Sequence, residues 1–319
     1  MLKDTGIKGG IEVKVFDAHC DVLYKLWLNP NLNFEYAQEL HANLERLKRG
    51  HSKVQLMALY IPEEVNYENR FEVALEMVHL FHEKVLNAHK EVKQVRTKRD
   101  IENLKDGEIG LMLSLEGCDA IGTSLTRLRT LFHLGVKSVG LTWNYGNAVA
   151  DGILEPRGAG LSLFGKQVVE ENNLFKVWTD VSHLSVKGFW DVLEVADFPI
   201  ASHSNSISLC KHPRNLSDEQ IKALIDKDSM MGINFVPYFL SEREEATISD
   251  VLRHLDYICA LGGENNVGFG SDFDGISSTV VGLEDFSKYD TLIEELSKHY
   301  SNGQVEKFIY QNFMNHLPE

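Results

Sequence analysis

Eight short apolar runs, rich in β-branched residues, recur along this 319-residue chain and alternate with longer segments of helical periodicity. Short runs of this kind are typical of buried strands, whereas apolar residues spaced three and four apart are typical of amphipathic helices. Strands that alternate with helices favour a parallel sheet with right-handed crossovers. Eight such units predict an α/β fold, a closed (β/α)8 barrel rather than an open doubly wound sheet. The expected strands are residues 13–21, 53–61, 109–117, 136–144, 175–183, 198–204, 231–238 and 267–273.

The segments between these runs carry helix signals of their own. Apolar residues recur at helical spacing over residues 71–85 and 252–261. Ser217 and Gln220 have the spacing of a capping box, which predicts a helix that begins there. Gly262-Gly263 stands where a helix would have to end before the last strand.

The length of the chain would accommodate two average domains, but α/β barrels of this size commonly form one. Hydrophobic residues make up 43% of the chain, enough for a large core, and no Pro- or Ser-rich linker divides it. We therefore expect a single catalytic domain over residues 1–319, in which residues 1–12 form an N-terminal extension.

The formal net charge of −15 argues against nucleic acid as a partner, because phosphate backbones would repel the chain. No run of about 18 apolar residues is present for a membrane span. The polar start MLKDTGIKGG lacks the apolar region of a secretory signal, and the four cysteines suggest no disulfide framework. These features predict a cytoplasmic protein that acts on neither nucleic acid nor membranes.

Polar residues of catalytic types end five of the predicted strands. Barrel enzymes form their active sites at the carboxyl ends of the strands, so these side chains should converge. Residues two apart share one face of a strand, and His19 and Asp21 can therefore both point into the barrel mouth. Asp17 and Asp180 are expected to have structural roles. The other strand-end candidates are Glu116, His183, His203 and Asp272.

Imidazole and carboxylate ligands together suit zinc or a similar first-row divalent ion. A lone histidine at a strand end is more often a hydrogen-bonded structural residue, but five compatible residues on four strand ends favour a metal site. Two histidine-containing half-sites and a carboxylate able to bridge them are typical of a centre with two metal ions. Such a centre predicts hydrolysis by a metal-activated water.

Six motifs resemble those of the membrane dipeptidase (renal dipeptidase) family of zinc metallopeptidases. Their order and approximate spacing match along nearly the whole chain, from about residue 13 to residue 316. The resemblance implies an amidohydrolase-like barrel, two zinc ions per chain and hydrolysis of dipeptides. The motifs are DAHCD (17–21), SLEG (114–117), DVSH (180–183), ASHS (201–204), KHPRN (211–215) and VGFGSDFDG (267–275).

The resemblance also implies a metal-binding role for five residues of this chain. One zinc ion would take His19 and Asp21, and the other would take His183 and His203. Glu116 would bridge the two ions.

Three further residues follow from the same resemblance. Asp272 matches the family's acid/base, and Arg214 matches the arginine that binds the substrate's terminal carboxylate through its planar fork. Trp143 is a departure, because the best-known members have there a histidine that contacts the reacting carbonyl. Indole offers a single N–H donor, so we expect Trp143 to form a wall of the substrate pocket and the metal ions to supply most of the carbonyl polarisation.

Two other functions remain open beside dipeptide hydrolysis. One is a related barrel metallohydrolase that acts on a β-lactam, an N-acyl amino acid or a lactone. The other is a binding protein that kept the metals and lost catalysis, although the presence of Asp272 argues against it. Members of the family are often dimers, so a homodimer is also expected, whereas the residues leave side-chain and stereochemical preference undecided.

Overall fold

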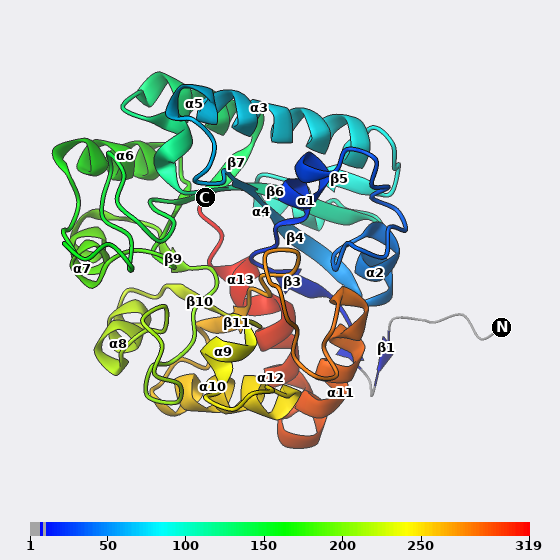
Figure 1. Ribbon diagram of the computed structural model, residues 1–319. Coiled ribbons are helices and arrows are strands. Elements are labelled where there is room, and N and C mark those ends of the chain that lie inside the picture. The colour runs from blue at the N-terminus through cyan, green and yellow to red at the C-terminus, as the bar shows by residue number, and fades with distance from the viewer. Residues whose placement is uncertain (1–6, 9–10) are drawn as a thin grey trace.

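The computed structural model in Figure 1 describes residues 7–8 and 11–319 and contains the expected barrel. Eight parallel strands follow one another around it in sequence order, and pairing between β4 and β6 closes the ring. The (β/α)8 prediction is confirmed. The barrel strands are β3 (Val15–Asp17), β4 (Ser52–Tyr60), β6 (Ile109–Glu116), β7 (Val136–Gly140), β8 (Trp178–Asp180), β9 (Pro199–Ala201), β10 (Met230–Ile233) and β11 (Val267–Phe269).

Most barrel strands are shorter than the runs that predicted them. β3 ends at Asp17, so His19 and Asp21 lie in the loop that follows, and the prediction that they share one face of a strand is wrong. The backbone of this loop still bonds to both neighbouring strands, because Ala18 N donates to Phe269 O and Cys20 N donates to Leu56 O. The polar end of the first run therefore forms a loop that stays tied to the barrel rim.

A ninth strand, β5 (Val92–Gln94), joins the same sheet and was not predicted. It pairs with Ile109–Leu111 of β6, on the edge that β7 occupies only from Leu113 onward. A three-residue strand at a sheet edge carries too few alternating positions to be recognised from the sequence.

Helices surround the barrel, as Figure 1 shows, and the predicted helical segments are confirmed. Residues 71–85 form α3 and then a π-helical turn at Phe81–Leu86, and the capping box at Ser217 begins α8. Gly262 follows α10 with a φ of 105°. The helices are α1 (Val22–Leu28), α2 (Leu44–Arg49), α3 (Arg70–Leu80), α4 (Lys98–Glu102), α5 (Leu125–Leu134), α6 (Leu163–Leu174), α7 (Val186–Val195), α8 (Asp218–Asp226), α9 (Pro237–Leu240), α10 (Ile248–Ala260), α11 (Tyr289–His299), α12 (Asn302–Glu306) and α13 (Asn312–Asn315).

Large apolar side chains fill the barrel toward the amino ends of its strands. Phe16 of β3 stacks on Phe313 of α13 with a ring-centroid distance of 5.0 Å, and Trp178 of β8 meets the same ring edge-on. Val54 and Met112 belong to the same buried cluster. The C-terminal helix therefore plugs one end of the barrel, which leaves the carboxyl ends of the strands for a polar site.

Two short strands precede the barrel, β1 (Ile7–Lys8) and β2 (Ile11–Glu12), which pair antiparallel in a sheet of their own. The rest of the extension predicted over residues 1–12 lies outside the described residues. Within residues 7–8 and 11–319, no helix has both the length and the apolar character that crossing a membrane requires.

Candidate metal centre and substrate cavity

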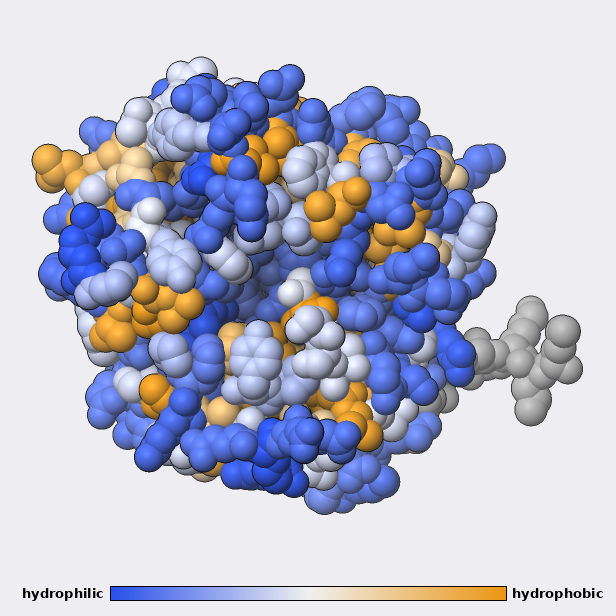
Figure 2. All heavy atoms as spheres, viewed as in Figure 1, coloured by the Kyte–Doolittle hydropathy of each residue, from blue (hydrophilic) through white to orange (hydrophobic). Residues whose placement is uncertain are grey.

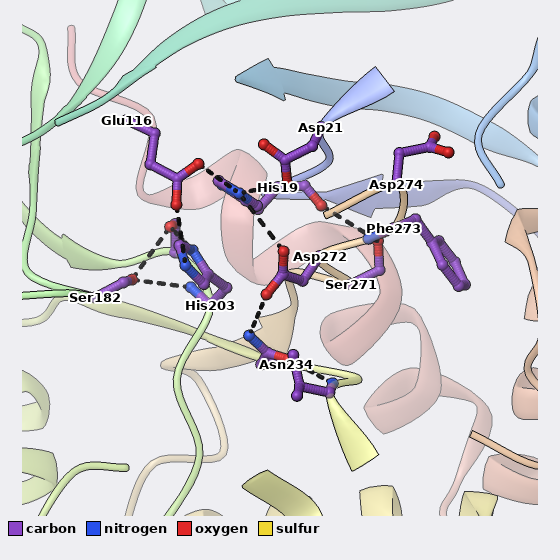
Figure 3. Close-up of polar contacts among 12 residues, drawn as sticks. His19, Asp21, Glu116, Ser182, His203, Asn234, Ser271, Asp272, Phe273 and Asp274 are labelled. Atoms are coloured by element: carbon purple, nitrogen blue, oxygen red, sulfur yellow. Dashed lines mark hydrogen bonds and ion pairs between the residues drawn. The ribbon is translucent and has the colours of Figure 1, made fainter. Parts of the chain in front are cut away.

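The five predicted metal ligands lie together at the carboxyl ends of the barrel strands. His19 and Asp21 follow β3, Glu116 is the last residue of β6, and His183 and His203 lie just beyond β8 and β9. Figure 3 shows Glu116, Asp21 and Asp272 arranged around the ring of His19, with His203 beside Glu116. The ligand atoms of His19, Glu116 and His203 all lie within 4.8 Å of one another, and so do those of His19, Asp21 and Asp272.

One half of this cluster is rich in carboxylates. His19 Nε2 lies 3.3 Å from Asp21 Oδ2 and 3.5 Å from Glu116 Oε2. Asp272 Oδ1 is 4.0 Å from the same nitrogen. All four side chains are largely buried, and His19 is only 2% exposed.

The other half is rich in imidazole. The Nε2 atoms of His183 and His203 face each other at 3.0 Å. Glu116 Oε1 lies 3.1 Å from His183 Nε2 and 3.9 Å from His203 Nε2. Since its other oxygen faces His19, the Glu116 carboxylate connects the two halves of the cluster.

Burial and charge shift the protonation of the three histidines in different directions. Burial lowers the pKa of His183 to about 4, with help from the positive charge of Arg214, and it also lowers the pKa of His203 well below its usual range. Burial would lower the pKa of His19 too, but the negative charges of Glu116 and Asp21 outweigh it and raise that pKa well above its usual value. His183 and His203 are therefore neutral at neutral pH, the form in which histidine binds a metal.

The cluster fits a bound divalent cation. His19 Nε2 and Asp21 Oδ1 are buried and have no hydrogen-bond partner among the described residues. The Nε2 atoms of the two neutral histidines and one oxygen of Glu116 also converge, and these atoms offer more acceptor lone pairs than there are protons to bond them. Buried polar atoms without partners are costly, and a cation coordinated by them would remove that cost.

Asp272 lies on a tight turn directly after β11. Its backbone has a φ of 64°, and its amide donates to His19 O at 3.1 Å. Asn234 Nδ2 donates to Asp272 Oδ2 at 2.9 Å, which leaves Oδ1 as the oxygen nearer to His19. A Cβ atom at Gly275 would lie 2.3 Å from Asp21 Oδ2 and 2.6 Å from Asp272 Oδ1, so a side chain at this position would displace carboxylates of the cluster. Burial raises the pKa of Asp272, as an acid that must hold a proton requires.

The two strand-end aspartates that were expected to be structural do bond to backbone. Asp17 Oδ1 accepts from the amides of His19 and Ser271, at 3.0 and 3.1 Å. Asp180 Oδ1 accepts from the amides of Ser182 and Ser202, both at 3.0 Å. Each aspartate therefore fastens its own strand end to that of a neighbour.

A cavity of about 410 Å³ opens beside the cluster, on the face that Figure 2 shows hollowed near its centre. Arg214 lines it although only 4% of the residue is exposed. Its Nη2 donates to His203 O at 3.3 Å, while its Nε and Nη1 have no partner among the described residues. Burial lowers the pKa of Arg214 to about 10, so it remains charged at neutral pH. Two free donors on a buried cation are suited to bind an anion.

Aromatic side chains also line the cavity. Trp143 is half-buried there, with its ring centroid 5.2 Å from that of Tyr60 and 6.1 Å from that of His183. Tyr60 in turn meets Tyr24 edge-on at 5.2 Å. In the described part of the chain, the Trp143 indole nitrogen makes no hydrogen bond. Trp143 therefore lines the cavity and is not part of the packed core, and its role in substrate binding stays a prediction.

Two functional contacts were missed from the sequence. Asn144 Oδ1 lies 2.9 Å from His183 Nδ1, and Asn234 holds Asp272 as described above. Asn144 directly follows Trp143 in LTWN, and Asn234 directly follows β10, so a strand-end position was the available signal. Neither asparagine belongs to a metal-ligand or acid/base residue type, and for that reason neither was singled out.

Comparisons with known proteins indicate the family to which the chain belongs. The profile of one family, described as Membrane dipeptidase (Peptidase family M19), matches residues 11–319. A dipeptidase of Aspergillus oryzae, aclJ, is 33% identical over 281 residues, which cover 83% of this chain but only 66% of that protein. A protein of Klebsiella pneumoniae, known by its position in the pqqA 5′ region, is 32% identical over 67% of this chain and 84% of its own length.

Solved structures give the same picture. A metallopeptidase of Rhodobacter sphaeroides, liganded with a phosphinate mimic of the dipeptide L-Ala-D-Ala, superposes with a TM-score of 0.89 at 29% identity. The superposition covers 96% of this chain and 98% of that one.

A barrel with a histidine–carboxylate cluster at its strand ends defines a metal-dependent hydrolase. The matched profile and the relatives narrow this class further. The chain belongs to the membrane dipeptidase family, peptidase family M19, and is a metallopeptidase of the dipeptidase type.

Proposed function

We propose that this protein is a two-zinc dipeptidase in which His19, Asp21, Glu116, His183 and His203 hold the metal ions. The observation that carries the proposal is the convergence of these side chains, with buried unpartnered atoms, beside an arginine that keeps two donors free. When bound, the ions lower the pKa of a water molecule and polarise the scissile carbonyl. The Rhodobacter enzyme, with its bound dipeptide mimic, supports a dipeptide as the substrate.

Proton transfer, substrate binding and the exclusion of water depend on side chains of the protein itself. Asp272 takes the proton of the attacking water and passes it to the leaving amine, while Asn234 keeps the carboxylate oriented. Arg214 binds the free carboxylate of the dipeptide and so fixes which residue lies over the cluster. Trp143 excludes water from its part of the cavity.

The first prediction concerns the metal ions. Protein supplied with zinc should hold two ions per chain and hydrolyse dipeptides, and Glu116→Ala should lose at least one ion and nearly all activity, because this carboxylate faces both halves of the cluster. Elemental analysis and a dipeptide panel measure both properties. Protein that takes up no zinc would contradict the proposal.

The role of Asp272 as acid/base rather than ligand predicts a split between activity and metal content. Asp272→Asn should lower kcat by about 100-fold or more while both ions stay bound, because the amide cannot accept the proton. Metal content and kcat are measured on the same preparation. Since Asp272 lies within reach of the same nitrogen as Asp21, loss of an ion from this variant would instead identify it as a ligand.

Arg214→Ala should mainly raise KM for dipeptides with a free carboxylate, because that contact exists in both the ground and transition states. A dipeptide with an amidated C-terminus serves as the control: it should be a poor substrate for the native protein, and the variant should hydrolyse it equally well. Metal content must also be checked, since Arg214 bonds to His203 O. Equal losses on both substrates would exclude the binding role, and unimpaired hydrolysis of a lactone would favour the alternative function.

Trp143 lines the cavity with a large apolar ring and a single N–H donor, so we expect it to stabilise the reacting carbonyl less than a histidine would there. Trp143→His should therefore raise kcat on ordinary dipeptides or shift the substrate range, provided that the variant keeps its metals. Trp143→Phe is the matched control, because it keeps an apolar wall and offers no donor. No change with either variant, across a broad panel, would leave Trp143 without a role in specificity.

A further inference from the structure

One buried hydroxyl is placed to decide which nitrogen of His203 carries its proton. Ser202 Oγ lies 2.7 Å from His203 Nδ1, the ring nitrogen that faces away from the metal cluster. The other ring nitrogen, Nε2, faces His183 and Glu116. A histidine binds a metal through Nε2 only when the proton is on Nδ1, so the direction of the Ser202 hydrogen bond matters for the site.

The surrounding hydrogen bonds settle that direction. The Ser202 hydroxyl donates to Asp180 Oδ2, and the Ser182 hydroxyl donates to Asp180 Oδ1 at 2.7 Å. The same carboxylate also accepts from the two backbone amides of these serines. The Ser202 oxygen also lies 3.2 Å from Ser182 Oγ. With its own hydrogen directed to Asp180, the Ser202 hydroxyl can only accept toward His203 Nδ1.

We infer that Asp180, acting through Ser202, is a positioning pair that holds the proton of His203 on Nδ1 and presents its bare Nε2 to the metal cluster. Ser182 supports the arrangement from the other side, because its oxygen accepts the backbone amide of His203 at 3.1 Å. The network is buried throughout: Ser202 and His203 are each 1% exposed. The consequence for metal binding rests on the proposed function, whereas the position of the His203 proton does not.

The matched test compares the two serines that flank His203. Ser202→Ala removes the acceptor at Nδ1, whereas Ser204→Ala removes a buried hydroxyl that has no partner in the described part of the chain. In metal-free protein with ¹⁵N-labelled histidine, the ring nitrogens report which of them is protonated, and the His203 signal is identified by its absence from a His203→Gln spectrum.

Native protein and Ser204→Ala should show His203 protonated at Nδ1, and Ser202→Ala should move the proton toward Nε2. Affinity for the zinc ion that His203 would hold should fall about 10- to 100-fold in Ser202→Ala, as it does when similar supporting contacts are lost, and stay unchanged in Ser204→Ala. Ser202→Thr keeps the hydroxyl and should restore both properties. If Ser202→Ala does not fold, Asp180→Asn provides the same comparison, since its amide no longer accepts all four hydrogens.

A native spectrum with His203 protonated at Nε2, or a Ser202→Ala spectrum like the native one, would overturn the inference. Because the spectrum is recorded without metal or substrate, this outcome is separate from failure of the proposed dipeptidase activity. Metal affinity that falls equally in both alanine variants would point to general loosening of the loop and would also contradict the positioning role.

Discussion

A single buried carboxylate, Asp17, joins the first barrel strand to the last, and the site depends on this junction. Asp17 accepts hydrogen bonds from two backbone amides and, at 2.7 Å, from the hydroxyl of Tyr289, which ties α11 to the same point. The loop after β3 then bonds to the loop after β11, with Asp21 N donating to Phe273 O and Asp272 N to His19 O. Residues some 250 positions apart in the sequence thereby become neighbours around one nitrogen, that of His19.

The same device recurs on the other side of the barrel. Asp17 accepts from the amide two residues ahead and from an amide of the neighbouring strand end, and Asp180 does the same through Ser182 and Ser202. Each junction precedes a histidine of the cluster, His19 in one case and His183 in the other. An aspartate at the end of a short parallel strand can replace the backbone hydrogen bonds that the sheet no longer supplies. The cost of burying its carboxylate is offset because both oxygens accept hydrogen bonds.

The order of the barrel strands and the identity of the clustered residues could be predicted from the sequence, because both depend on local sequence patterns. Apolar runs mark strands, and polar residues at their ends mark the rim where a barrel site forms. The exact strand ends could not be read, since residues such as His19 look like strand continuations until the loop hydrogen bonds are known. Asn144, Asn234 and Ser202 were beyond prediction for a related reason: their importance comes from contacts with residues on other strands.

The cavity beside the cluster combines a buried charge with aromatic walls. Arg214 brings a buried positive charge whose Nε and Nη1 have no partner among the described residues, and Tyr24, Tyr60 and Trp143 form a row of rings in the lining. Glu116 and His183 line the same cavity, so an anion bound by Arg214 would lie beside the cluster. Since the desolvation cost of an unpaired guanidinium is large, an uncharged substrate would leave Arg214 uncompensated. Under the proposed function, burial of the arginine therefore favours a substrate with a terminal carboxylate as much as the contact itself does.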